Sequence, residues 1–185
     1  MGEREEKRET TAIVCRLEEE WARLFRHVAE ELAALSTSGQ VAPGAPHISL
    51  QVVEGRLSQA AVDALRASLK KQEPLDVYFR GVGRFYFPRP VIYVTVVRNR
   101  SLERLHRRVR RALRPFGLQA DRLYGRRQWV PHLSLVLDDV GDAITPRLRD
   151  FEKKGAFRGV ARVEALEILG PAGEREVLWL AAEER

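Results

Sequence analysis

The chain has 185 residues, a hydrophobic fraction of 44% and a charged fraction of 31%, which suit one soluble domain or one domain built from two similar halves. No apolar run approaches the roughly 20 residues that a membrane-spanning helix needs, and the charged N-terminus lacks the apolar stretch of a secretory signal. The net charge of +6 favours an anionic partner such as nucleic acid, and a single cysteine, Cys15, excludes an intrachain disulfide. These features predict a cytoplasmic protein with no membrane partner.

Hydrophobic periodicity predicts two series of elements in the same order: strand, long amphipathic helix, loop, strand, shorter helix and final strands. The first series consists of a strand at 11–17, a helix at 18–35, a strand at 47–53, a helix capped by Ser58, and strands at 75–82 and 91–97. The second shares strand 91–97 and continues with a helix from Ser101 to Phe116, a strand at 129–137, a helix at 145–154 and a strand pair at 157–169 and 176–181. This order predicts an internal duplication.

The duplication predicts two lobes of one unit rather than two mobile domains. We expect a flexible charged tail at 1–10 and a single bilobal domain at 11–185. The first repeat covers about 11–90 and the second about 91–182. Whether the lobes exchange terminal strands stays open, as does the oligomeric state, for which a monomer is favoured.

A five-residue motif occurs once in each series, as "PHISL" at 46–50 and "PHLSL" at 131–135. Residues i and i+2 of a strand share a face, so His47 lies beside Ser49 and His132 beside Ser134. The apolar residues of both strands face the opposite side, which suits a core: Ile48, Leu50, Val52, Leu133, Leu135 and Leu137.

Two imidazoles that face one site can divide acid–base work, because one can be neutral and the other protonated near pH 6.5. Two hydroxyls can donate hydrogen bonds to the non-bridging oxygens of a phosphate and stabilise its developing charge. One His-x-Ser in a strand is more often incidental. Two copies at matching places predict a shared phosphate-transfer site that needs neither a metal nor a cofactor.

With these motifs the sequence resembles the 2H phosphoesterase superfamily, close to the bacterial and archaeal 2′-5′ RNA ligase-like proteins. The resemblance runs from about Ala12 to Ala182. It is carried by "PHISL" and "WVPHLSL", which match the family's His-x-(Thr/Ser)-x signature, and by "GVGRFYFPRPVIYVTV", which resembles the segment leading into the family's second lobe. It implies an α+β fold of two pseudo-symmetric lobes, whose antiparallel sheets face each other across a central cleft with helices packed outside.

The resemblance also implies metal-independent hydrolysis of 2′,3′-cyclic phosphates or 2′-5′ phosphodiesters of RNA or nucleotides, with 2′-5′ RNA ligation as the reverse reaction. By motif position, His47 and His132 would be the acid–base pair, and Ser49 and Ser134 would hold the phosphate. Arg127 falls where relatives often carry an arginine.

Further candidates for substrate binding lie in two loops. Arg126 and Arg127 could bind a phosphate, and Tyr124 could stack on a base. Tyr86, between Phe85 and Phe87, could form part of a stacking wall. Trp129 shares its strand face with the core-facing leucines, so we expect it in the core.

Three alternatives remain open at this stage. The helix at 101–116 carries Arg104, His106, Arg107, Arg108, Arg110, Arg111 and Arg114 on a polar side, which could follow an RNA backbone or be merely solvated. A non-enzymatic RNA-binding module would use this helix and the cleft, and a third reading is a phosphoesterase of a small nucleotide such as a cyclic ADP-ribose phosphate. We expect His106 to be solvated and His27 to be structural or exposed.

The sequence contains no P-loop, dinucleotide fingerprint or close Cys/His zinc pattern. A metal held by the two histidines with Asp138 or Asp139 is less favoured than a phosphate, because each histidine is followed at the second position by a serine. We therefore expect no metal site and no cofactor.

Overall fold

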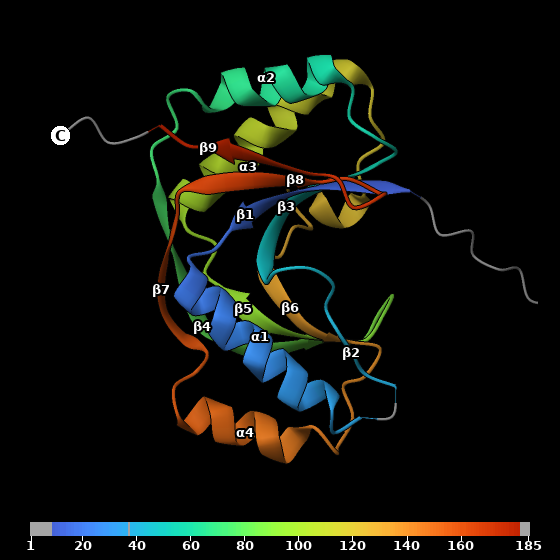
Figure 1. The fold of residues 1–185 in the computed structure, drawn as a ribbon, viewed down its shortest axis with the longest axis vertical. Helices are drawn as coiled ribbons and strands as arrows, with labels where there is room; N and C mark the ends of the chain where they lie inside the picture. Colours follow the sequence, from blue (N-terminus) through green and yellow to red (C-terminus); the bar gives the residue numbers. More distant parts are fainter. Residues whose placement is uncertain (1–8, 37, 182–185) are drawn as a thin grey trace, which may run out of the picture.

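In the computed structural model, which describes residues 9–36 and 38–181, two antiparallel sheets lie one above the other, each with two helices (Figure 1). The helices are α1 (Glu19–Ala33), α2 (Gln59–Leu69), α3 (Arg100–Leu113) and α4 (Thr145–Lys153), with short 3₁₀ helices at Arg114–Phe116 and Arg122–Tyr124. The strands are β1 (Thr10–Arg16), β2 (Gln40–Val41), β3 (His47–Glu54), β4 (Leu75–Phe85), β5 (Val91–Val96), β6 (His132–Leu137), β7 (Arg158–Val163), β8 (Ala165–Leu169) and β9 (Arg175–Trp179). Most of the expected tail at 1–10 lies outside the described residues, and Thr10 already belongs to β1.

The upper sheet has the strand order β3-β1-β8-β9 and the lower sheet the order β2-β6-β5-β4-β7. The strand expected at 157–169 is wrong as a single element. It divides at Glu164 into β7, which pairs with β4 in the lower sheet, and β8, which pairs with β1 and β9 in the upper sheet. An unbroken apolar pattern does not reveal this change of sheet, because sheet membership depends on pairing with distant strands.

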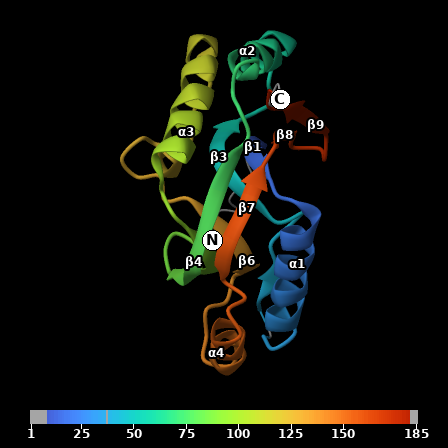
Figure 2. The same ribbon diagram turned by 90° about the vertical axis from the view of Figure 1, so that its left-hand side faces the viewer.

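The two segments expected to be repeats, about 11–90 and 91–182, both contribute strands to both sheets. The first repeat supplies β1 and β3 to the upper sheet, but its last strand, β4, pairs with β5 of the second repeat in the lower sheet. The second repeat supplies β5 and β6 to the lower sheet and β8 to the upper one. The long helices cross as well, since α1 packs against β6 and α4, whereas α3 packs against α2 and β3 (Figure 2). Each lobe is therefore built from both repeats.

Both motif strands carry a β-bulge directly after the serine. The pairing of β3 with β1 skips Leu50, and the pairing of β6 with β5 skips Leu135. A bulge inserts one residue and reverses the alternation beyond it. Val53 and Val136 are consequently buried while Val52 and Leu137 are only partly so, which corrects the strict alternation expected from the sequence.

The helix starts follow ordinary capping chemistry. The Ser58 side chain accepts a hydrogen bond from the backbone N–H of Ala61, as predicted. For α3 the predicted cap, Ser101, is wrong: the Asn99 side chain accepts the bond from the Leu102 N–H at 2.8 Å, and the helix begins at Arg100. Cys15 is fully buried, as expected, and burial raises the pKa of its thiol. Among the described residues, no helix is long and apolar enough to cross a membrane.

Candidate active site

The two motif histidines are held in the same way. His47 Nδ1 lies 2.8 Å from the carbonyl oxygen of Ala45, and His132 Nδ1 lies 2.8 Å from that of Val130. A carbonyl oxygen only accepts, so in each neutral ring Nδ1 carries the proton and donates it. This fixes the tautomer, and the lone pair of each Nε2 remains available as a base.

The motif residues lie around two adjoining cavities between β3 and β6, which contact each other. His47, Ser49, Ser134 and Tyr124 line a cavity of about 200 Å³. His132, with the same Ser134 and Tyr124, lines a second cavity of about 290 Å³. The structure therefore brings both histidines, both serines and Tyr124 together, although the two motifs are 85 residues apart in the sequence.

Burial lowers the pKa of His47 and of His132, because an imidazolium loses hydration in a partly buried site. The backbone hydrogen bonds oppose this shift in both rings. The charge of His47 lowers the pKa of His132 further, so the two rings are close enough to interact. Such coupling favours a state in which at most one of the two carries a proton on Nε2.

His47 differs from His132 in having a carboxylate nearby. Glu167 on β8 is 7% exposed and receives two hydrogen bonds from Arg175, of 2.7 and 3.0 Å. The Glu167 charge raises the pKa of His47, against the lowering effects of burial and Arg175. The sequence reading missed this pair; a glutamate inside the apolar strand "ALEIL" was its signal.

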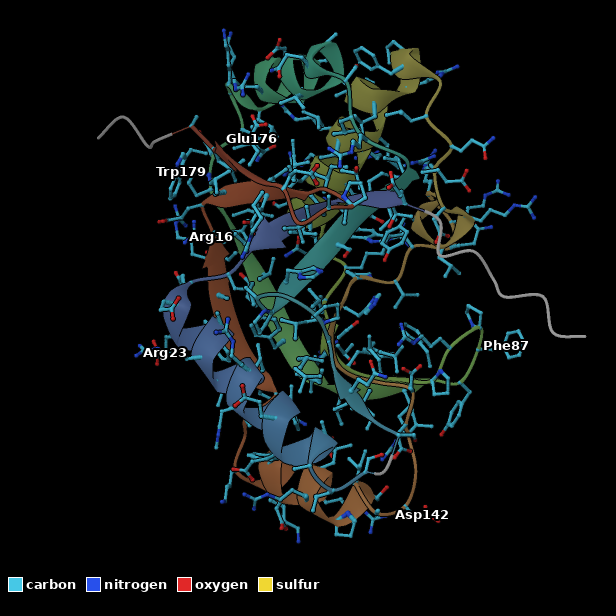
Figure 3. All side chains as sticks on the ribbon, turned by 45° about the vertical axis from the view of Figure 1, so that its right-hand side comes forward. Arg16, Arg23, Phe87, Asp142, Glu176 and Trp179 are labelled. Atoms are coloured by element: carbon cyan, nitrogen blue, oxygen red, sulfur yellow. The ribbon has the colours of Figure 1, made fainter. Side chains whose placement is uncertain are left out.

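His132 instead lies against aromatic rings. Phe85 and Tyr93 stack at 4.1 Å, and both meet the His132 ring edge-on, at 5.0 and 5.4 Å. Phe87, which is 89% exposed at the tip of the β4–β5 connection, lines the same cavity as His132 (Figure 3). Tyr86, the candidate chosen from the sequence, is 69% exposed and lines neither of the two cavities.

The loop between α3 and β6 reaches across to Ser49. The Tyr124 side chain forms a hydrogen bond with the Ser49 side chain, and burial raises the pKa of Tyr124, so its hydroxyl keeps its proton. Trp129 Nε1 donates to the Ser49 carbonyl oxygen at 3.0 Å and is 1% exposed, as its expected core position requires. Arg98 donates to the carbonyl oxygens of Arg126 and Trp129, at 2.7 and 3.0 Å.

His106 is buried, which makes the expectation of a solvated side chain wrong. It is 1% exposed, its ring lies flat on Trp129 at 4.0 Å and 9°, and its Nε2 lies 3.0 Å from the Tyr124 carbonyl oxygen. Burial, with Arg110 and Arg98 nearby, lowers the pKa of His106 to about 4. The sequence contained a signal, because position 106 lies one helical turn from the apolar residues Leu102 and Val109.

Arg126 and Arg127 are exposed on this loop and line neither cavity. His27 is exposed and pairs with Glu31. Within the described ranges no cluster of three or more His, Cys, Asp or Glu side chains could hold a metal ion. Asp138 pairs with Arg89, and Asp139 accepts hydrogen bonds from Ser36 and from the Gly141 N–H.

Comparison with known proteins agrees with the fold. The sequence matches the family described as the 2′-5′ RNA ligase superfamily over residues 14–175. No curated protein matched it. Similar solved structures include TT0787 of Thermus thermophilus, with a TM-score of 0.66 and 16% identity, covering 95% of this chain and 100% of that chain.

E. coli LigT complexed with NADP⁺ has a TM-score of 0.65 and 15% identity, covering 95% of this chain and 99% of that one. Usb1 of Kluyveromyces marxianus has a TM-score of 0.57 and 12% identity, covering 92% and 98%. At these identities the structures establish the two-lobed α+β fold, while the family match extends through both His-x-Ser motifs. The chain therefore belongs to the 2′-5′ RNA ligase superfamily, among the 2H phosphoesterases.

Proposed function

We propose that this protein is a metal-independent phosphodiesterase that hydrolyses 2′,3′-cyclic phosphates or 2′-5′ phosphodiesters of RNA or nucleotides. Family membership assigns a phosphoesterase- or ligase-type reaction. The observation that carries the finer proposal is the paired arrangement of His47 and His132, each oriented by a carbonyl oxygen and each beside a serine that lines the cleft. LigT structures with 3′-AMP and with NADP⁺ support a nucleotide substrate.

The chemistry follows from the tautomers. Neutral His132 takes a proton from water through Nε2 as the water oxygen bonds to phosphorus. Protonated His47 donates its Nε2 proton to the 3′-oxygen as the P–O3′ bond breaks, which leaves a 2′-phosphate and a 3′-hydroxyl. Glu167 supports His47 as the acid, because its charge favours the imidazolium.

Ser49 and Ser134 donate hydrogen bonds to the non-bridging oxygens, whose negative charge grows in the transition state. Tyr124, which retains its proton, supplies a third hydroxyl at the same cavity. A 5′-hydroxyl in place of the water would form a 2′-5′ linkage by the same proton transfers. None of these steps draws on a metal ion.

The direct test is the hydrolysis of nucleoside 2′,3′-cyclic phosphates and 2′-5′ dinucleotides in the presence of EDTA. We expect turnover to persist and the cyclic substrates to give 2′-phosphates, identified by phosphorus NMR. Activity that EDTA abolishes and a divalent metal restores would refute the mechanism. A 3′-phosphate product would overturn the assignment of the leaving oxygen.

The lowered histidine pKa values predict an acid-shifted pH profile. Catalysis needs one neutral and one protonated imidazole, and burial places both pKa values below the ordinary 6.5. As pH rises above 6.5 the imidazolium that serves as the acid disappears, so kcat/KM should fall. We expect its maximum on the acid side of pH 6.5, measured with a cyclic mononucleotide. A maximum on the alkaline side would contradict the burial argument.

A further inference from the structure

The positive charge of this protein is concentrated in one segment. Residues 98–127 contain eleven arginines and only two carboxylates, Glu103 and Asp121, which gives an excess of nine positive charges. The whole chain has a net charge of +6, so the remaining residues together carry a net charge of −3. The basic character of the protein is therefore a property of α3 and the loop that follows it.

Nine of these eleven arginines are exposed. The seven from position 104 onward form what we call the arginine surface: Arg104, Arg107, Arg111, Arg114, Arg122, Arg126 and Arg127. Within residues 9–36 and 38–181, none of their side chains forms an ion pair, although Arg98 in the same segment pairs with Glu103. Unpaired arginine side chains keep their full charge toward solvent. They are available to a polyanion without first giving up an internal partner.

The equivalent helix of the first repeat has the opposite charge. Helix α1 carries Glu19, Glu20, Glu30 and Glu31 against Arg23 and Arg26. It lies in the lower lobe, whereas α3 lies in the upper lobe (Figure 2). The pseudo-symmetry of the fold thus does not extend to the charge of these two helices.

The arginine surface is continuous with the cleft through the loop at 122–128. On one side of this loop, Leu123, Tyr124 and Gln128 line the cavity that contains His132. On the other side the loop is fixed to α3, because His106 Nε2 lies 3.0 Å from the Tyr124 carbonyl oxygen and the His106 ring stacks on Trp129. Arg122, Arg126 and Arg127 are therefore placed between the cleft and the arginines of α3.

We propose that the arginine surface binds the backbone of a single RNA strand whose 3′-terminal cyclic phosphate occupies the cleft. This rests on the proposed function and narrows its substrate to a strand rather than a mononucleotide. A 2′,3′-cyclic phosphate requires a 2′-hydroxyl, which restricts the strand to RNA. It also terminates the 3′ end, so the strand leaves the cleft in the 5′ direction over the loop and α3.

The test compares cyclic-phosphate-ended RNA of increasing length, from a mononucleotide to about 16 nucleotides. We expect kcat/KM to rise about tenfold or more with length at low salt, then level off once the strand covers the arginine surface. The triple variant Arg107→Gln, Arg111→Gln and Arg114→Gln should lose most of this gain and leave mononucleotide turnover unchanged. Its plot of log kcat/KM against log salt should be shallower by about 2, because each phosphate contact contributes about 0.7.

A matched control removes three exposed positive charges from the lower lobe: Arg149→Gln, Lys153→Gln and Lys154→Gln. The proposal requires this control to behave like the unaltered protein. Equal losses in both triple variants would overturn it, since net charge alone would then explain the effect. A wild-type protein that cleaves mononucleotides and strands with equal kcat/KM at low salt would also overturn it, while leaving the proposed reaction intact.

A binding measurement tests the arginine surface independently of the proposed hydrolysis. Fluorescence anisotropy of a labelled strand with a 2′-phosphate end should report weaker binding by the α3 triple variant and not by the control. If no cyclic phosphate is cleaved but this difference in binding remains, the arginine surface stands and the proposed reaction fails. Equal binding by the two variants would overturn the surface whatever the catalytic result.

Discussion

His47→Ala and His132→Ala are each expected to lower the rate of cyclic phosphate hydrolysis about 10²–10⁴-fold, the usual contribution of one general acid or base. The two losses should be similar in size, because both rings are oriented by the same Nδ1 contact and neither can take over the other's proton transfer. Single-turnover rates on a cyclic mononucleotide measure the chemical step directly.

The variants should also differ in pH dependence. Loss of the base removes the acid limb of the profile, and loss of the acid removes the alkaline limb. With His132 as the base, His132→Ala should lose the acid limb. Ser49→Ala and Ser134→Ala should have smaller effects than the histidine variants. Each removes one hydrogen bond to an anion and should lower the rate of hydrolysis about 10–100-fold. Full activity in either histidine variant would refute the paired mechanism.

We expect His106→Phe to destabilise the protein at pH 7 but not at pH 4. The folded protein holds the pKa of His106 at about 4, whereas the unfolded chain has the ordinary value of 6.5. As the pH falls through this interval, His106 becomes protonated in the unfolded chain but stays neutral in the folded protein. The stabilisation that comes from neutral His106 is fully present above pH 6.5. Roughly 3 kcal/mol of the free energy of unfolding is lost by pH 4.

Phenylalanine preserves the ring on Trp129 but leaves the Tyr124 carbonyl oxygen without its partner, so at pH 7 it should cost about 1–3 kcal/mol. At pH 4 the variant should match or exceed the wild type, because it has no buried imidazole to keep neutral. Urea unfolding at several pH values measures the crossing. His27→Gln is the control, since His27 is exposed, and it should show no crossing.

The catalytic candidates were within reach of sequence reasoning because they are local. A strand of alternating residues places His47 beside Ser49 wherever the strand packs, and the second copy at 132–135 doubles the signal. The order of elements followed from periodicity in the same way. The expectation that both motifs face one site came from their repetition, because repeated motifs indicate equivalent positions in a duplicated fold.

The features that escaped the sequence depend on contacts between distant segments. In the sequence His106 stands among arginines and looks polar, whereas in the structure its ring contacts Tyr124 and Trp129 of the following loop. The division at Glu164 depends on which strands β7 and β8 pair with. The role of Glu167 depends on two distant residues. It accepts hydrogen bonds from Arg175 on the neighbouring strand β9, and its charge raises the pKa of His47.

The crossed arrangement of the repeats bears on how such a molecule could have begun. Neither repeat contains a whole lobe, because each places its long helix against the other's motif strand and its last strand in the other's sheet. A half-length chain with a single His-x-Ser motif would therefore have unpaired strand edges and an uncovered apolar helix face. Two copies could satisfy both by exchanging these elements, as in a domain-swapped homodimer. Such a pair would place one histidine from each subunit at the shared site.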